Sequence, residues 1–486
     1  MKVVKLHEFI CLDKDSSEPL YIQIHNEIKK FIENGTLKPN DKLPAIRALA
    51  GKLSVNNVTI VNAYKLLEQN LLAYSKVGSG TFVSDKKTKY SHREQYNNSV
   101  TVSPREGTVH ENKFEINFAT LTPDPACFPV NEFKEAMNEV LDRDGGYAFA
   151  YQEAKGYYPL RESLKEYILD RGISVDTEDL HIISGAQQGI DIVSKALINF
   201  DDTIVVESPT YTGALAAFRS RGANIIEVPI EDGGMNIESL EEALRKHSPK
   251  LIYVMTSFQN PTGISYSEEK KRELLRLANK YNTYILEDDY LPELKFDGEE
   301  AFPVKSIDNH DRVIYLKSFS KIFMPGIRLG FLAVPKSLAA NIMSAKHTSD
   351  ISTSSLMQRT FDLYLRQKKW QGHINKMRDI YRDKYEIITR ALETHAPFIE
   401  YYNPNGGIHL YLKTDIDSLM LSSVIKQRGA SVVPGRVFYL DNREDTYFRV
   451  SFAAVDNDKI EEGIKIIRDS YMDLKNLNSG NLFPFL

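Results

Sequence analysis

The sequence has little cysteine and no long apolar run, and both shortages limit what it can encode. Only two cysteines, Cys11 and Cys127, occur in 486 residues. They cannot build a disulfide framework or a metal site of the usual ligand spacing, so we expect no metal and a reducing cytoplasm. No run approaches the roughly 18 residues that span a membrane, which predicts no membrane contact. The opening stretch MKVVKLHEFICLDKD lacks an apolar core and a cleavage site, so we expect no signal peptide.

Length and composition favour a soluble globular protein of two or three domains. A chain of 486 residues is too long for one hydrophobic core. Residues 1–84 contain 11 Lys and Arg against 8 Asp and Glu, whereas the whole chain has a net charge of −5. This contrast allows an N-terminal module that faces nucleic acid, but it does not require one.

Three amphipathic segments and a β-hairpin are expected near the N-terminus. The first segment, PLYIQIHNEIKKFIENGTL, places its apolar residues on one helical face, and Gly35 ends it. Residues 46–53 and 60–67 each repeat the i, i+3, i+4, i+7 spacing, and Asn56 or Asn57 can cap the second of these helices. Two short helices with a tight connection are typical of a helix-turn-helix. The stretch LLAYSKVGSGTFV adds two strands that form a small wing.

The rest of the chain divides into a linker and a large α/β domain. Residues 85–113 have few apolar residues and no periodicity, which predicts a flexible linker between residues 1–84 and 114–486. From about residue 114, Val-, Ile- and Tyr-rich runs such as TIVVES, LIYVMTS, TYILEDD and RVIYLKS alternate with helical patterns. This alternation predicts an α/β fold with a mainly parallel sheet.

Polar motifs follow these runs, at the edge where open α/β sheets bind ligands. In chain order they are SGAQ after LHII, PTY after TIVVES, NPTG after LIYVMTSFQ, DDY after TYILE and SFSK after RVIYLK. Together they supply a helix start suited to a phosphate, an aromatic ring, an amide, a carboxylate and a lysine.

The order and spacing of SGxQ, NPTG, EDDY, FSK and PGxRxG resemble those of fold type I aminotransferases, which use pyridoxal phosphate. Residues 18–84 resemble a GntR-type winged helix-turn-helix, and the whole chain is similar to the MocR subfamily of GntR regulators, which joins the two domains. The resemblance implies a homodimer. It also implies a large cofactor-binding part at about residues 145–345, with a small part formed by the remaining C-terminal region.

The resemblance implies a role for each motif residue toward pyridoxal phosphate. Lys321 would form the Schiff base, whereas Lys317 matches no family role. Asp288 would pair with the pyridinium nitrogen, and Asp289 is the alternative. The other implied cofactor contacts are Gly185, Ala186, Gln187, Ser318, Ser320 and Arg328 at the phosphate, Tyr211 stacked on the ring, and Asn260 and Tyr290 at the phenolic oxygen. The family often has a hydroxyl residue where Ala186 stands, so there the backbone N–H would remain as the phosphate donor.

Two further matches concern activity. Arg449, in TYFRVSF, stands where aminotransferases keep the arginine that grips the substrate α-carboxylate. Tyr151, in YQEAKGYYPLRESL, resembles the tyrosine that reaches the cofactor phosphate of the partner subunit. Both leave transamination chemically possible.

The winged-helix resemblance implies contacts to double-stranded operator DNA. These are Arg47 at a phosphate or base, Asn57 and Thr59 at the start of the recognition helix, and Lys76 and Gly78 in the wing. The chain reads AIR where the family usually has SSR, and NN where it usually has SR. These changes remove a hydroxyl cap and a charge, so we expect lower affinity for phosphate, while asparagine can read adenine.

Two functions remain open, together with a plainer alternative. The first is a transcriptional regulator that senses pyridoxal phosphate or an amino compound through Schiff-base chemistry. The second is an aminotransferase of the aminoadipate or aromatic amino acid type with an auxiliary DNA-binding domain. A binding scaffold without cofactor is the third, and the fused winged helix favours the first.

Overall fold

The computed structural model describes residues 10, 12, 19–33, 35–53, 55–69, 72–76, 80–83, 115–298, 301–441 and 443–478. The chain forms two compact units, residues 1–100 and 101–486. The expected linker at 85–113, Cys11 and Gly78 lie outside the described residues. In the described part of the chain, no helix combines the length and apolar character that a membrane crossing needs.

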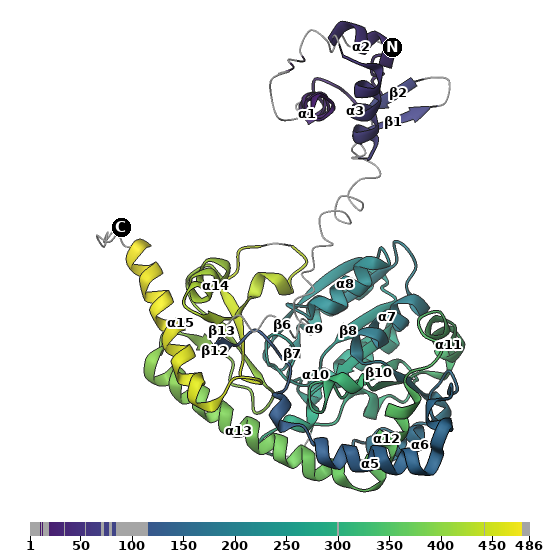
Figure 1. Cartoon of the computed structure of the whole chain (residues 1–486), viewed down its shortest axis with the longest axis vertical. Coiled ribbons are helices and arrows are strands. Elements are labelled where there is room, and N and C mark those ends of the chain that lie inside the picture. Colours follow the sequence, from purple (N-terminus) through teal and green to yellow (C-terminus); the bar gives the residue numbers. More distant parts are fainter. Residues whose placement is uncertain are drawn as a thin grey trace. The chain divides into compact units, whose positions relative to one another are not determined.

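The described residues of the N-terminal unit form three helices and an antiparallel hairpin (Figure 1). They are α1 (Leu20–Glu33), α2 (Ile46–Leu53), α3 (Asn57–Gln69), β1 (Ala73–Lys76) and β2 (Gly80–Val83). The core is built from the apolar faces that the periodicity predicted, with Ile24, Ile28 and Ile60 fully buried. The side chain of Asn56 accepts a hydrogen bond from the N–H of Val58 at 3.1 Å, so Asn56 caps α3.

The second unit is built around an eight-stranded sheet with the strand order β4-β11-β10-β9-β8-β5-β6-β7. These strands are β4 (Leu180–Ile183), β5 (Thr203–Ser208), β6 (Asn224–Glu231), β7 (Gly234–Met235), β8 (Leu251–Val254), β9 (Tyr284–Asp289), β10 (Val313–Ser318) and β11 (Gly330–Ala333). The five strands from β10 to β6 are parallel to one another, whereas β11 is antiparallel to both β10 and β4, and β7 is antiparallel to β6. The expected α/β class with a mainly parallel sheet is confirmed.

Successive side chains of the strands face opposite sides of this sheet, and each side has its own core. In β5, Ile204 and Val206 join the larger core, and Val205 joins the smaller one under α9 and α10. The helices of this region are α5 (Val130–Asp144), α6 (Tyr158–Leu169), α7 (Ala186–Leu197), α8 (Thr212–Ser220), α9 (Ile237–His247), α10 (Glu268–Lys280), α11 (Ala339–His347) and α12 (Ser355–Arg366). A Cβ on Gly189 of α7 would stand 2.6 Å from Leu316 of β10, so α7 lies close against the sheet.

A smaller C-terminal lobe completes the second unit. It contains α13 (Lys369–His395), β12 (Glu400–Tyr401), β13 (His409–Lys413), α14 (Ser418–Gln427), β14 (Ala430–Ser431), β15 (Val433–Pro434), β16 (Tyr447–Ser451) and α15 (Asn457–Asn478). Strand β3 (Ile116–Asn117) pairs with β14, so the start of the unit joins this lobe. The long helix α13 runs from the side of α12 to α15 (Figure 1).

Candidate functional site

A cradle for an anion forms where β4 passes into α7. Gly185 caps α7 with a φ of +90°, a conformation that favours glycine. A Cβ at Gly185 would lie 2.7 Å from the Arg328 guanidinium. That guanidinium donates to the Ser184 carbonyl and, at 3.4 Å, to Ser320 Oγ. A helix start, a hydroxyl and a guanidinium therefore meet at the predicted phosphate position.

The aromatic residue of the PTY motif is tied to the same helix start. Tyr211 precedes α8, is half-buried, and donates from its hydroxyl to Gln187 Oε1 at 3.2 Å. Gln187 in turn donates to the Gly213 carbonyl at 2.9 Å. Half-buried Ala186 opens α7 between these groups. The predicted residues Ala186, Gln187 and Tyr211 thus belong to one neighbourhood.

Asp288 and Asp289 at the end of β9 face opposite sides of the sheet. Asp288 is beside Leu316 in the neighbouring strand, on the side that α7 covers. Its Oδ2 accepts from the Tyr253 hydroxyl at 2.8 Å, and burial raises its pKa to about 7. Asp289 instead accepts from the Tyr315 hydroxyl at 2.8 Å, and it pairs with Arg171. Only Asp288 thus faces the side of the anion cradle.

The same alternation separates the two lysines of the KSFSK stretch. Lys317, inside β10, is fully buried beside Asp289 and pairs with Glu293 at 2.7 Å. Burial lowers the pKa of Lys317 although Glu293 opposes this shift. Ser318 is one position on and faces the Asp288 side. Lys321 is half-buried and follows Ser320, just beyond the end of β10.

The predicted carboxylate grip and the NPTG turn are in direct contact. Arg449 of β16 is fully buried and donates to Asn260 Oδ1 at 2.8 Å and to the Ala119 carbonyl at 2.8 Å. Because Asn260 accepts through Oδ1, its amide N–H groups stay available as donors. The Tyr290 hydroxyl donates to the Phe258 carbonyl at 2.7 Å, two residues before Asn260.

One buried residue that supports these motifs was not identified from the sequence. Glu207, next to the end of TIVVES, is fully buried and accepts from the Tyr266 hydroxyl at 2.8 Å and from Gln259 Nε2 at 3.1 Å. Gln259 also donates to the Pro209 carbonyl at 2.8 Å. Glu207 therefore joins the PTY turn to the NPTG turn. A carboxylate inside an apolar run was the available signal, because such a group needs buried donors.

Tyr151 is exposed on the surface of the second unit. Its side chain is 81% exposed, in a stretch where Tyr147 and Phe149 are 78% and 69% exposed. These aromatic side chains follow α5 on the surface of the second unit.

The predicted DNA contacts are in the first unit. Arg47 on α2 and Asn57 at the start of α3 are exposed, as is Val58 at 60%, while Thr59 is half-buried. Lys76 ends β1, opposite Gly80 of β2. Exposed polar groups at the start of α3 suit contacts to base edges in a groove.

The residues present in the second unit fit pyridoxal phosphate. Asp288 Oδ1 is buried and has no hydrogen-bond partner among the described residues, so one carboxylate oxygen remains for a cationic ring nitrogen. The cradle at Gly185 has no room for a side chain but offers backbone N–H groups to a phosphate. Lys321 supplies an amine beyond the end of β10.

Comparison with protein families assigns both units. Residues 116–467 match the family "Aminotransferase class I and II", which covers most of the chain. Residues 20–83 match "Bacterial regulatory proteins, gntR family".

Similar proteins fall into two groups. The HTH-type transcriptional regulator YdfD of Bacillus subtilis, which is uncharacterised, is 30% identical over 461 residues, or 92% of this chain and 95% of that protein. Aromatic-amino-acid aminotransferase 1 of Thermococcus litoralis is 34% identical over 364 residues, or 73% of this chain and 87% of that protein. The crystal structure of kynurenine aminotransferase from Pyrococcus horikoshii superposes with a TM-score of 0.71 at 31% identity, covering 80% of this chain and 96% of that one.

Proposed function

Because the chain belongs to the class I and II aminotransferase family and carries a GntR-family domain ahead of it, we propose that it is a DNA-binding transcriptional regulator that senses pyridoxal phosphate or an amino compound. In support, the alignment with the HTH-type transcriptional regulator YdfD covers 92% of the chain and so spans both domains. The single observation that carries the proposal is that a GntR-family domain and an aminotransferase-family domain occur in one chain. An exposed α3 start suits DNA, and the Gly185, Asp288 and Lys321 region suits the cofactor.

The proposal gives a task to each predicted site residue of the second unit that is named below. Gly185 and Arg328 hold the cofactor phosphate, and Asp288 holds a proton on the ring nitrogen through an ion pair. When bound, pyridoxal phosphate supplies an aldehyde for amino groups and a ring that accepts electrons. Lys321 is the attachment amine and moves the proton at the amino acid Cα. Arg449 binds the carboxylate of the amino compound in a bidentate pair.

A second candidate function is transamination. The contact between Arg449 and Asn260 favours it, because the carboxylate grip and the group at the phenolic oxygen are then positioned together. The relatives include proteins named 2-aminoadipate transaminase and aromatic-amino-acid aminotransferase 1. Sensing and turnover use the same residues, so both can occur in one protein.

DNA binding decides the regulator function. Gel shifts with the duplex upstream of the protein's own gene should show binding at low salt that weakens steeply as salt rises. An amino compound should change that affinity in the wild type but not in Lys321→Ala. No binding at low salt, with or without pyridoxal phosphate, would exclude the regulator.

Turnover decides the aminotransferase function. The protein is mixed with amino acids and 2-oxoglutarate, and the 2-oxo acid product is followed over time. A rate no faster than that of free pyridoxal phosphate excludes transamination.

We also propose that the second unit is a homodimer in which exposed Tyr151 reaches the partner's cofactor phosphate. Sedimentation of wild type and Tyr151→Phe should give dimers for both. The variant should bind pyridoxal phosphate more weakly, because it lacks the hydroxyl. A monomeric wild type would contradict this proposal.

A further inference from the structure

A chain of hydrogen bonds runs from the anion cradle at Gly185 to the segment between α11 and α12. Its members are Ser184 before the cradle, Gln188 in the first turn of α7, Lys346 in the last turn of α11, and Asp350 just after that helix. The functions proposed above give these four residues no task. The chain nevertheless ends at the carbonyl that holds the predicted phosphate arginine.

The Arg328 guanidinium is held by hydrogen bonds rather than by packing. Arg328 is exposed, and its guanidinium donates to the Ser184 carbonyl and, over a longer distance of 3.4 Å, to Ser320 Oγ. A long side chain that is already fixed before its ligand arrives loses less conformational freedom on binding. The position of the Ser184 peptide therefore decides how well Arg328 is prepared for a phosphate.

Gln188 fixes the backbone at Ser184. It is the third residue of α7, and its Oε1 accepts from the Ser184 N–H at 2.6 Å. This contact is similar to a capping box, in which a glutamine at the third helical position accepts from the backbone N–H at the cap. Here the donor is one residue earlier, so the bond closes the turn that contains Gly185.

Asp350 determines which end of the Gln188 amide faces the cradle. Its Oδ2 accepts from Gln188 Nε2 at 2.8 Å, and its Oδ1 accepts from Nζ of Lys346, also at 2.8 Å. Burial raises the pKa of Asp350, but the bonds from Lys346 and Gln188 outweigh burial and keep that pKa below its ordinary value. An ionised carboxylate only accepts, so the NH₂ end of the amide must face Asp350 and the oxygen end is left for Ser184.

The segment that carries Asp350 is itself well anchored. The Asp350 N–H donates to the Lys346 carbonyl at 2.9 Å, and fully buried Gln358 donates to the Thr353 carbonyl at 2.7 Å. Gln358 also accepts from the Tyr157 N–H at 2.7 Å. The carboxylate is therefore fixed by contacts away from the cradle, so it can orient Gln188 before a ligand binds.

We propose that Asp350 and Gln188 are positioning residues for the phosphate of the cofactor. The Asp350 carboxylate orients the Gln188 amide, the amide holds the Ser184 peptide, and the peptide carbonyl aims Arg328 at the phosphate. The inference rests on the proposed binding of pyridoxal phosphate. It makes part of the preference for a phosphorylated ligand depend on two side chains that act through Ser184.

The test compares pyridoxal phosphate with pyridoxal, which has the same ring and aldehyde but no phosphate. Absorbance titration of the full-length, cofactor-free protein gives both dissociation constants. The dissociation constant of pyridoxal divided by that of pyridoxal phosphate is the phosphate preference.

Two variants interrupt the chain at different points. Gln188→Met keeps the length of the side chain, removes both of its hydrogen bonds and leaves Asp350 paired with Lys346. Asp350→Asn keeps the shape but adds an NH₂ group, which faces one of the two donors. Each variant should lower the phosphate preference by about tenfold, because a charge-assisted hydrogen bond to the phosphate is weakened, while pyridoxal should bind as before.

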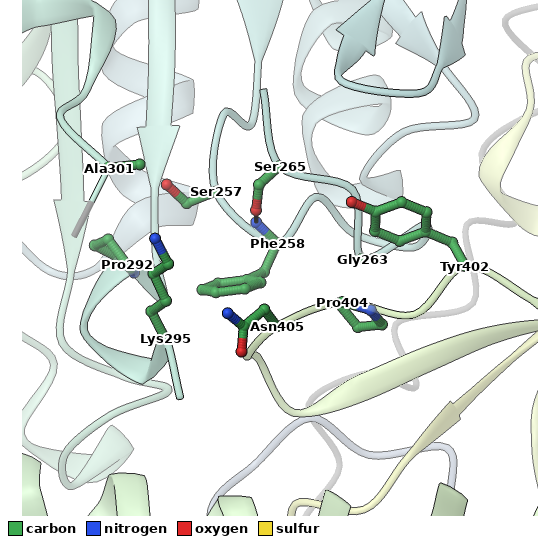
Figure 2. A pocket seen from close by; sticks show the side chains of 10 residues that line it. All are labelled: Ser257, Phe258, Gly263, Ser265, Pro292, Lys295, Ala301, Tyr402, Pro404 and Asn405. Atoms are coloured by element: carbon green, nitrogen blue, oxygen red, sulfur yellow. Dashed lines mark hydrogen bonds between the residues drawn. The ribbon is translucent and has the colours of Figure 1, made fainter. Parts of the chain in front are cut away.

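Two control variants remove contacts of the same kinds elsewhere. Ser265 Oγ accepts from the Phe258 N–H at 3.0 Å and shapes the NPTG turn instead of the cradle (Figure 2), so Ser265→Ala should keep the wild-type preference. Asp191 pairs with Lys195 at 2.7 Å on α7 itself. Asp191→Asn should also keep the preference, because this ion pair does not contact Ser184 or Gln188.

Phosphorus-31 NMR and urea unfolding separate positioning from a structural role. With the cofactor bound, the phosphorus signal of Gln188→Met should move toward that of free pyridoxal phosphate. A structural role alone predicts a lower free energy of unfolding with an unchanged preference. The wild-type preference in Gln188→Met would overturn this inference and leave the proposed cofactor intact. A wild type that does not bind pyridoxal phosphate would instead contradict the cofactor proposal, and this inference with it.

Discussion

Lys317 and Lys321 are four residues apart but have opposite surroundings. Lys317 is inside β10, fully buried, with Glu293 at 2.7 Å, and the Tyr167 hydroxyl also contacts Glu293. Lys321 is beyond the strand end and half-buried, at the edge of the sheet where the predicted cofactor contacts lie. The chemistry of a lysine here is set by its place along the strand rather than by its neighbours in sequence.

This difference predicts opposite effects of removing each amine. Lys321→Ala should fold normally and lose covalent pyridoxal phosphate, because no amine remains for attachment. Lys317→Met should lose about 3 kcal/mol of unfolding free energy, because Glu293 stays buried without its cation. Borohydride reduction with mass spectrometry measures attachment, and urea unfolding measures stability. Cofactor mass retained in Lys321→Ala would contradict the assignment.

The two carboxylates of β9 give a second matched pair. Asp288→Asn should slow the reaction with an amino acid about 100-fold or more, because the ring nitrogen loses its negative partner. Asp289→Asn should leave that reaction nearly unchanged and cost about 3 kcal/mol of stability, since Arg171 stays buried. Stopped-flow absorbance on mixing with amino acid gives the rate. A slow reaction with the amino acid in Asp289→Asn, together with a fast one in Asp288→Asn, would show that Asp289 and not Asp288 faces the ring nitrogen.

The role of each motif residue comes from the family resemblance and stays a prediction, but the position of the polar motifs after the strands of the large sheet could be predicted from the sequence pattern. Their partners could not, because these come from distant parts of the chain. Tyr253 holds Asp288 from 35 positions away, and Arg171 reaches Asp289 from 118. The hydrophobic pattern predicts that β8 and β9 are strands but not that they are neighbours. The hydrogen-bond donors to each carboxylate could therefore not be predicted from the sequence.

At the scale of elements, buried Glu207 holds two loops in place. It joins the turn after β5 to the NPTG turn through Gln259. Burial raises the pKa of Glu207 to about 8, against an ordinary value of about 4.3. Between these pH values the unfolded chain gives up a proton that the folded protein keeps, so the free energy of unfolding falls as pH rises.

Glu207→Gln should remove this dependence. From pH 5 to pH 7 the wild type should lose about 2 kcal/mol more unfolding free energy than the variant does. Urea unfolding at both pH values measures the difference. Equal slopes for the two proteins would show that Glu207 is ionised when folded.

Two kinds of DNA contact are predicted, from Asn57 at the start of α3 and from Arg47 on α2. Asn57→Ala should cost about 1–3 kcal/mol on the bound sequence and little on unrelated DNA, because an asparagine amide pairs with adenine. Arg47→Ala should weaken binding to the specific sequence and to unrelated DNA to a similar extent, because it removes a predicted phosphate contact. The slope of log affinity against log salt concentration should then fall by about 1. Fluorescence anisotropy with specific and random duplexes measures this. Loss of discrimination in Arg47→Ala instead would make it the base-reading residue.

For the whole molecule, the main feature is that each unit has its own hydrophobic core. Ile24, Ile28 and Ile60 belong to the core of the first unit, and the residues of the other cores all come from the second. A unit with its own core unfolds as its own cooperative step.

Calorimetry should therefore resolve two transitions. Pyridoxal phosphate should raise only the transition temperature of the second unit, since a ligand stabilises the part that binds it. A specific DNA duplex should raise only the transition temperature of the first unit. A single transition that both ligands raise equally would show that the units unfold together.

Separate cores also make the chain suitable for building chimeras. A different winged head could be fused ahead of residue 101 without altering any described residue that packs inside the second unit. Such a fusion would turn the recognition of a small amino compound into expression of a chosen reporter gene. The same architecture would let recombination redirect one sensor to new promoters.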